Sequence, residues 1–258
     1  VTLLMDPEVP CGVTLAFTER TGGFSEGEFA SLNLGSRCGD NLQHVQKNRQ
    51  LVLEALGAGE HFSRLLIPHQ VHGSKVVCLT SNTSEAFELA QAEAEAGADA
   101  IVCTVQNTPV MLAFADCVPV ILVAPGGFAV AHSGWKGTIA RISARATKAL
   151  CQATGSTPSE VKAYIGPHIG GADYEVSLEL IQMFSQEFGP GVVDRASGER
   201  YLDLGYAVRA ALVDAGVRES AIEEVTDSTA STTERFFSYR AEHGKCGRHA
   251  AVAYMASK

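Results

Sequence analysis

Apolar residues recur along this chain in two patterns, and each pattern predicts a different element. Where Leu, Val and Ala return every three to four positions, an amphipathic helix is expected, and two such segments stop at Gly57 and Gly155, a residue type that suits a helix end. The Ala- and Glu-rich segment 85–97 predicts a solvated helix or a surface excursion. Apart from this segment, helices are predicted at 42–56 and 138–154, which end at these two glycines, and at 177–188 and 204–215.

Short, nearly continuous apolar runs predict β-strands. They follow one another closely, with short turns between them, so we expect antiparallel or mixed sheets flanked by helices. This is an α+β arrangement. The strands are predicted at 12–17, 65–67, 76–79, 100–103, 110–114, 118–123, 128–131, 161–165 and 250–254.

Composition narrows the class of protein. A chain of 258 residues suits one large domain or two small ones, and 46% hydrophobic with 19% charged residues is ordinary for a globular protein. No apolar run reaches the length of a membrane span, and the first residues lack the pattern of a secretion signal. The seven cysteines are odd in number and scattered, which favours a reducing compartment, so we expect a cytoplasmic protein without membrane contact. The net charge of −9 argues against a nucleic-acid partner.

Three residues have the right chemistry for a metal site: His72, Cys117 and His132. A thiolate and two neutral imidazoles are ligands that zinc accepts, and three protein ligands leave a fourth position open, as in catalytic zinc sites. The residues are 45 and 15 positions apart, unlike the close pairs of structural zinc sites. They must therefore converge through tertiary folding.

His69 competes with His72 for the ligand position. In an extended segment these two side chains point to opposite faces, so only one of them reaches a given site. His72 is preferred because Gly73 follows it and leaves room for close approach.

Other interpretations of the same residues stay open at this point. Cys117 and His132 both border apolar runs and can be plain core residues. Together they can instead form the nucleophile and base of a metal-free cysteine hydrolase or amidase. A non-enzymatic metal or nucleoside sensor is a third alternative.

Many short motifs follow one another along the chain. They are Thr18–Gly23, Ala30–Gly35, Asn48–Arg49, His69–Gly73, Gly97–Ala100, Ala115–Pro119, His132–Thr138, Ile165–Pro167, Phe236–Arg240 and Gly247–Arg248. In these motifs and in their order, the chain from about Thr14 to Met255 resembles the YfiH/YlmD family of laccase-type proteins.

The resemblance implies one domain over residues 1–258 with layered α/β/β/α architecture and a zinc site at His72, Cys117 and His132. It implies phosphorolysis of purine nucleosides to free base and ribose 1-phosphate, with adenosine deamination and methylthioadenosine phosphorolysis as further activities. The partners would be a purine nucleoside and phosphate, and the protein a monomer or homodimer. The older laccase label implies copper, which also binds nitrogen and sulfur ligands tightly. A copper-dependent polyphenol oxidase fits less well, because the eight histidines are few and dispersed.

Phosphorolysis also requires cationic groups, and the sequence offers candidates for them. Arg49, Lys136 and Arg240 are expected to bind phosphate or stabilise charge, although Lys136 stands where the family more often has arginine. Asp116, next to a predicted ligand, is the candidate proton shuttle or, alternatively, a turn residue that caps backbone amides. Substrate binding is assigned to Asn33 and to Trp135, the only tryptophan, which can stack on a base or lie in the core.

Overall fold

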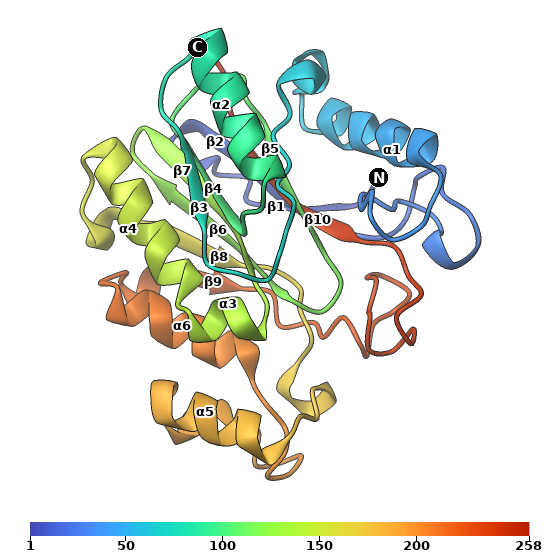
Figure 1. The fold of residues 1–258 in the computed structure, drawn as a ribbon, viewed down its shortest axis with the longest axis vertical. Coiled ribbons are helices and arrows are strands. Elements are labelled where there is room, and N and C mark those ends of the chain that lie inside the picture. The colour runs from blue at the N-terminus through green and yellow to red at the C-terminus, as the bar shows by residue number, and fades with distance from the viewer. Residues whose placement is uncertain (258) are drawn as a thin grey trace.

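In the computed structural model, which describes residues 1–257, two β-sheets face each other (Figure 1). The strands are β1 (Leu3–Met5), β2 (Val13–Thr18), β3 (Val76–Leu79), β4 (Ala100–Cys103), β5 (Val110–Phe114), β6 (Val118–Ala124), β7 (Gly127–Ser133), β8 (Lys162–Ile165), β9 (Ile222–Glu224) and β10 (His249–Met255). One sheet has the order β1-β2-β10-β5 and is antiparallel throughout. The other has the order β3-β4-β7-β6-β8-β9 and is mixed, because its two outer pairs are parallel.

Helices cover the outer faces, and polar side chains determine where most of them begin. The side chains of Asn41, Thr83, Ser177 and Asp203 each accept a backbone N–H from the first turn of the helix that follows, which satisfies a donor that the helix itself leaves free. The helices are α1 (Leu42–Ala55), α2 (Ser84–Glu95), α3 (Trp135–Ile139), α4 (Ile142–Thr154), α5 (Leu178–Phe188) and α6 (Leu204–Asp214).

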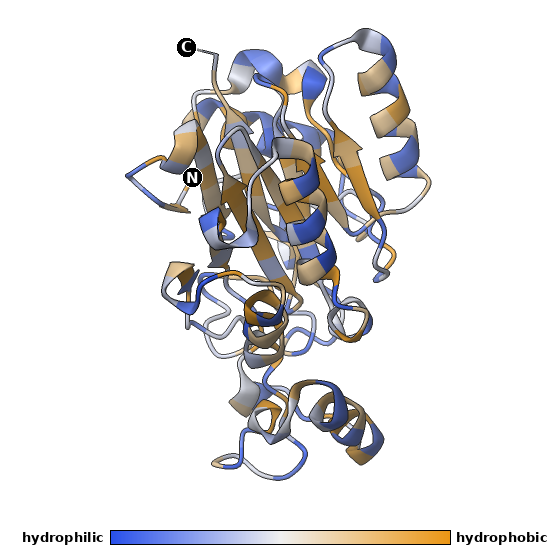
Figure 2. Ribbon diagram, turned by 90° about the vertical axis from the view of Figure 1, so that its left-hand side faces the viewer, coloured by the Kyte–Doolittle hydropathy of each residue, from blue (hydrophilic) through white to orange (hydrophobic). Residues whose placement is uncertain are grey.

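Three apolar clusters hold the layers together. One lies between the two sheets, where Phe17 of β2 and Val130 of β7 are both buried. A second lies between the four-stranded sheet and α1, and a third between the six-stranded sheet and α4, α5 and α6. Figure 2 shows the strands as predominantly hydrophobic and the outer helices as alternating between hydrophobic and hydrophilic residues. The predicted α+β fold with α/β/β/α layers is confirmed.

The predicted helix 138–154 is in fact two helices. α3 begins earlier than expected, at Trp135, and Arg141 interrupts the path with a left-handed backbone of φ 56° before α4 starts. The Arg141 guanidinium pairs with Glu187 at 2.5 Å and with Asp214 at 2.8 Å, two partners distant in sequence. Local periodicity contains no sign of such long-range pairs, which is why the break was not predicted.

The strand predictions need two smaller corrections. The run 65–67 is not a strand, since only Leu66 forms an isolated bridge, to Val110, after a 3₁₀ turn at Gly59–Arg64. β1 and β9 were not predicted, because three-residue strands at sheet edges carry too little periodicity to be distinguished from loops.

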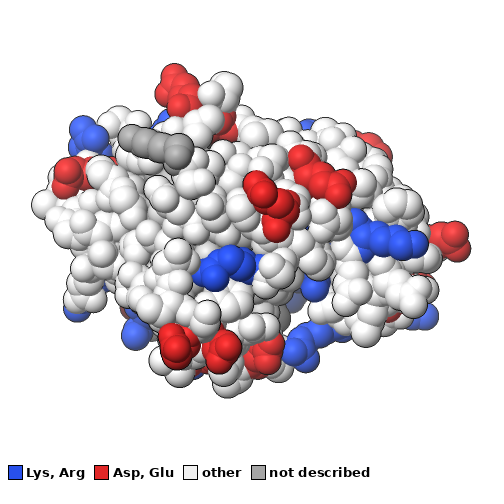
Figure 3. All heavy atoms as spheres, turned by 90° about the horizontal axis from the view of Figure 1, so that it is seen from above, with Lys and Arg blue, Asp and Glu red and all other residues white. Residues whose placement is uncertain are grey.

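Three structural features bear on the membrane, cysteine and charge expectations. None of the helices in the described part of the chain is long and apolar enough to cross a membrane. All seven cysteines are free thiols. On the face seen in Figure 3, basic and acidic side chains are interspersed, and the basic ones form no continuous patch there.

Candidate active site

A cavity of about 610 Å³ opens where the turn between β5 and β6 meets loops from both ends of the chain. It brings together segments that are far apart in sequence. Its walls are formed by Gly35–Cys38, Arg49, Ile67, Pro68, Gln70, His72, Ala113–Cys117, His132, Tyr174, Tyr239, Arg240 and Arg248.

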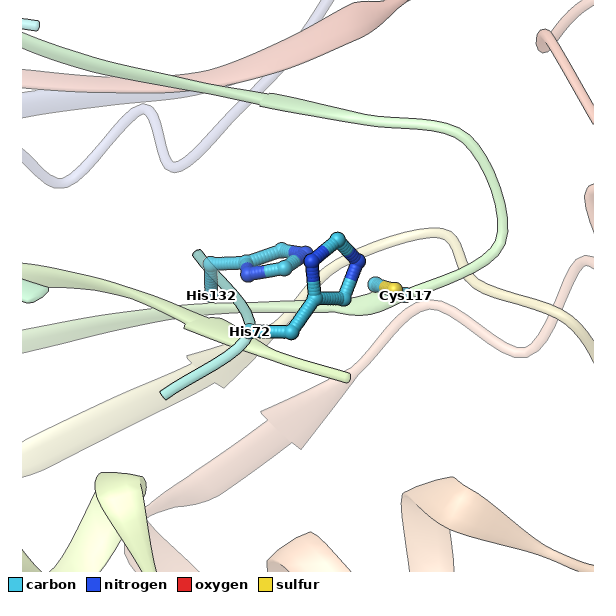
Figure 4. Close-up of side chains that lie close together, drawn as sticks. All are labelled: His72, Cys117 and His132. Carbon is cyan, nitrogen blue, oxygen red and sulfur yellow. The ribbon is translucent and has the colours of Figure 1, made fainter. Parts of the chain in front are cut away.

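In the wall of this cavity the three predicted metal ligands converge. The donor atoms of His72, Cys117 and His132 all lie within 4.8 Å of one another. Figure 4 shows the three side chains approaching one another from three separate segments. The two imidazole rings meet edge to face, with centroids 4.8 Å apart. The site is graded in burial, with His132 buried, Cys117 half-buried and His72 exposed, so it is reached from the cavity.

A buried carboxylate orients His132. Nδ1 of His132 lies 2.8 Å from Oδ1 of Asp99. An ionised carboxylate has no proton to donate, so Oδ1 can only accept this hydrogen bond. Nδ1 therefore carries the proton, and Nε2 is the ring nitrogen that remains for a ligand. Burial tends to raise the pKa of Asp99, but its hydrogen bond with His132 and the charge of that ring hold the pKa below its usual value.

His72 reaches the site through an unusual backbone conformation. Its φ of 57° places it in the left-handed region, which is uncommon for residues other than glycine and is often found at functional sites. His69 is outside the ligand group, as expected, but the segment is a loop and not a strand, so the argument from opposite strand faces was wrong. The N–H of Gly73 donates to Oδ2 of Asp99 at 2.7 Å.

The electrostatics of the site favour a thiolate. Burial alone would raise the pKa of Cys117, but the charge of His132 and hydrogen bonds from both histidines outweigh it and lower the pKa to about 6. Burial tends to lower the pKa of His132, whereas the Cys117 charge and the Asp99 hydrogen bond raise it to about 9. A thiolate is the form in which cysteine binds a metal or acts as a nucleophile.

These residues fit a metal ion in donor type, orientation and space. Two imidazoles and one thiolate are a zinc donor set, and Asp99 holds the ring of His132 in the way that carboxylates hold metal-binding histidines. Gly134 packs directly against the group, since a Cβ there would lie 3.0 Å from Cδ2 of His72 and 3.1 Å from Sγ of Cys117. Any larger residue would crowd the donor atoms.

The rest of the cavity wall is rich in arginine. Arg49 is half-buried on α1 and donates from both Nε and a terminal nitrogen to the carbonyl of Leu34, at 3.0 and 2.8 Å. Burial lowers its pKa to about 10, so the guanidinium stays charged at neutral pH. Arg37, Arg240 and Arg248 also line the cavity. A protein of net charge −9 thus has a concentrated positive charge here, as an anionic ligand requires.

Asp116 lines the same cavity but is heavily engaged. Its Oδ1 accepts the hydroxyl of Thr229 at 2.7 Å, and its Oδ2 accepts the backbone N–H of Arg240 at 2.7 Å. Its φ of 84° makes the sharp turn that leads into Cys117. The carboxylate therefore joins the C-terminal loop to the ligand turn, and its predicted role as proton shuttle stays a prediction.

The other predicted site residues lie away from the cavity wall. Asn33 is fully buried and binds Asp40 at 2.8 Å and the Arg248 backbone N–H at 2.8 Å, so it supports two lining segments from behind. Lys136 is exposed, with its ammonium 5.3 Å from the centre of the Trp135 ring, and neither residue is among those that line the cavity. Their predicted roles stay predictions.

Several residues of the site were not assigned a role from the sequence. Arg248 and Asp99 both lie in the motifs that carry the family resemblance, which was the available signal. Tyr239 also lies in one of these motifs, Phe236–Arg240, whereas Arg37 and Tyr174 do not. Tyr174 and Tyr239 are stacked by guanidinium groups, Arg240 at 5.1 Å and Arg248 at 5.8 Å from the respective ring centres.

The fold and the site define an α+β protein with a His–Cys–His site in the wall of an arginine-lined cavity. Residues 14–256 match the family described as multi-copper polyphenol oxidoreductase laccase, and the chain belongs to this family.

Characterised relatives and solved structures agree with this assignment. A purine nucleoside phosphorylase from Deinococcus radiodurans is 37% identical over 92% of this chain and 87% of its own length. An adenosine deaminase called RL5, from an unknown prokaryotic organism, is 31% identical over 89% of this chain and 88% of its own. The crystal structure of the YfiH protein of Bacillus licheniformis superposes with a TM-score of 0.87 at 32% identity, covering 98% of this chain and 96% of that one.

Proposed function

We propose that this protein is a zinc-dependent purine nucleoside enzyme that phosphorolyses adenosine, inosine and methylthioadenosine and also deaminates adenosine. The observation that carries the proposal is the composition of the cavity, which combines one His–Cys–His group with four arginines. The names of its relatives, purine nucleoside phosphorylase and adenosine deaminase, correspond to reactions for which these two groups are suited.

His72, Cys117 and His132 would hold the metal. Zinc supplies Lewis acidity and acidifies coordinated water. Asp99 keeps the Nδ1 proton on His132, so that Nε2 faces the donor group. The described residues contain one such cluster, which supports a single ion better than the several coppers of a multicopper oxidase. Zinc is therefore proposed over copper.

The arginines in the same cavity wall would bind phosphate. A guanidinium offers five donors, and Arg49 uses two of its nitrogens on Leu34, which leaves further N–H groups for an anion. Arg240 has one nitrogen on the carbonyl of Glu175 and stacks on Tyr174. Fixed arginines would place phosphate beside the nucleoside, so that a phosphate oxygen can form a bond to C1′ of the ribose while the bond from C1′ to the base breaks and the base leaves.

A substrate panel tests the proposal. Adenosine, inosine, guanosine and methylthioadenosine are incubated with and without phosphate, and the products are identified by chromatography. We expect phosphate-dependent release of free base with ribose 1-phosphate, and phosphate-independent conversion of adenosine to inosine. The metal content of protein purified without added metal should approach one zinc per chain. Full turnover in the presence of a strong chelator would contradict metal dependence.

A second candidate, a metal-free cysteine hydrolase, has one specific observation in its favour. Cys117, His132 and Asp99 form a chain of thiolate, imidazole and carboxylate, the arrangement of a nucleophile, a base and an orienting acid. Metal content separates the two candidates. Zinc-free protein that forms an acyl-enzyme with an activated ester while showing no nucleoside turnover would favour the hydrolase.

We also propose a cytoplasmic location, because a reducing compartment keeps the seven cysteines as the free thiols seen in the structure.

A further inference from the structure

Asp99 immediately precedes β4 and is completely buried. A carboxylate removed from water is costly unless its oxygens are fully hydrogen-bonded. Both oxygens of Asp99 meet this condition. Oδ1 accepts from Nδ1 of His132 at 2.8 Å and from the backbone N–H of His72 at 2.9 Å. Oδ2 accepts from the backbone N–H groups of Gly73, at 2.7 Å, and Val71, at 3.3 Å.

The register of the six-stranded sheet brings Asp99 to His132. β4 and β7 pair with Ala100 opposite Ala131, and the next step along the ladder places Asp99 opposite His132. The backbone bond from the His132 N–H to the Asp99 carbonyl, 2.7 Å long, continues the pairing. Residues directly opposite each other in an antiparallel pair present their side chains on the same face. The contact between carboxylate and imidazole is therefore built into the strand pairing.

The same carboxylate shapes the loop that carries His72. Three consecutive backbone N–H groups, those of Val71, His72 and Gly73, point at its two oxygens. A run of N–H groups turned toward one anion forms a nest, and such nests contain residues in the left-handed conformation. His72, with φ 57°, has this conformation. The anion stabilises a backbone shape that is otherwise unfavourable for histidine.

We infer that Asp99 is the positioning residue of the metal site, acting on two ligands from two different segments through one carboxylate. It selects the tautomer and ring orientation of His132 through the side chain. It places His72 through the backbone. Cys117, the third ligand, is independent of Asp99 and is positioned by the turn at Asp116. This inference rests on the proposed metal-dependent function.

The variant Asp99→Asn tests it, because asparagine has the same size but no charge, and its NH₂ group cannot accept a hydrogen bond. One side of the nest then faces a donor instead of an acceptor. We expect the affinity for zinc, measured by competition with a chromophoric chelator, to fall about 10- to 100-fold, the range found when a carboxylate behind a metal-binding histidine is lost. Cobalt-substituted protein should show altered ligand-field bands, because the two histidines change position, while the cobalt–thiolate charge-transfer absorption that reports on Cys117 should persist.

Glu19→Gln is the matched control. Glu19 is also a buried carboxylate, 8% exposed and paired with Arg235 at 2.7 Å, but it is not among the residues that line the cavity. We expect this variant to lower the melting temperature and to leave zinc affinity and the cobalt spectrum unchanged. If Asp99→Asn does the same, Asp99 has only a structural role and the inference is wrong.

Wild-type protein provides a test that does not depend on a variant folding. In ¹⁵N spectra of the zinc-loaded protein, His132 should carry its proton on Nδ1 and coordinate through Nε2. Coordination through Nδ1 would overturn the inference. These outcomes are distinct from failure of the proposed function: a protein that binds zinc through Asp99-oriented histidines but turns over no nucleoside would contradict the function alone.

Discussion

Two groups of residues in the cavity wall are built differently, namely the metal site (His72, Cys117 and His132) and the arginine group (Arg37, Arg49, Arg240 and Arg248). In the metal site, His132 lies within β7 and Cys117 immediately precedes β6, while His72 lies on a loop whose backbone is hydrogen-bonded to Asp99, immediately before β4. In the arginine group, Arg37, Arg240 and Arg248 lie on connecting segments outside the helices and strands, and two of them are exposed. A metal requires donor atoms within a fraction of an ångström, which strands and a loop tied to one of them can provide. Attraction between charges falls off slowly with distance, so loop-borne arginines suffice for an anion.

Arg49 belongs to the arginine group, but like the metal ligands it is held firmly by the scaffold. It lies on α1, is half-buried and is tied to the Leu34 carbonyl by two nitrogens. The scaffold determines its direction more strictly than that of the exposed Arg37 and Arg240. We therefore expect it to matter more for anion binding than the exposed Arg37 and Arg240.

The largest expected effect comes from removing a ligand of the metal site. Cys117→Ser replaces the thiolate by a neutral hydroxyl, and we expect zinc affinity to drop more than about 100-fold and nucleoside turnover to be lost, while circular dichroism stays unchanged. Cys151→Ser, a half-buried thiol on α4 away from the cavity, is the control and should retain both zinc and turnover. Turnover in the Cys117→Ser protein without bound metal would contradict the dependence of the reaction on the metal site.

Arg49→Ala should distinguish the role of the arginine group from that of the metal site. Loss of a charged hydrogen bond costs roughly 1.5–3 kcal/mol, so the KM for phosphate should rise about 10- to 100-fold, while phosphate-independent deamination of adenosine is retained. Arg49→Lys should recover part of the phosphate affinity, because the charge stays but the planar fork is lost. Arg64→Ala, outside the cavity, serves as the control. Equal loss of both reactions would show that Arg49 supports the fold.

The pH dependence of Cys117 alkylation reports on the metal site alone. In metal-free protein, alkylation of Cys117 by iodoacetamide should be half-maximal near pH 6, because His132 and His72 lower the thiol pKa to about 6. The rate should rise as pH increases through this value and then level off. Cys151, whose pKa is raised by burial, should react with its midpoint at a clearly higher pH than Cys117. Peptide mapping by mass spectrometry distinguishes the two thiols, and coincident midpoints would contradict the electrostatic picture.

The smallest effect is expected at Lys136. The family position suggested a role in charge stabilisation, but the ammonium lies over Trp135 and outside the cavity lining. We therefore expect Lys136→Ala to change the KM for phosphate and kcat by less than about twofold, as is usual for exposed charges. A larger change in kcat would mean that the cavity extends to α3 when substrate is bound, and would restore the role expected from the sequence.

Much of this protein was predictable from local patterns. Helical periodicity and glycine stops located α1 and the end of α4, and continuous apolar runs located the strands of both sheets except the two short edge strands. The ligand set was also recognisable, because thiol and imidazole groups are rare and chemically specific. These features depend on residue type and on neighbours a few positions away.

Tertiary structure alone decided which groups act together. The contact of Asp99 with His132 follows from one strand register, and the break at Arg141 follows from pairs with Glu187 and Asp214. Arg37 and Arg248 reach the cavity wall from segments more than 200 positions apart. A sequence encodes periodicity over a few residues, whereas strand register, loop closure and the pairing of distant charges arise from the packing of the whole chain, and those determined how this site is held.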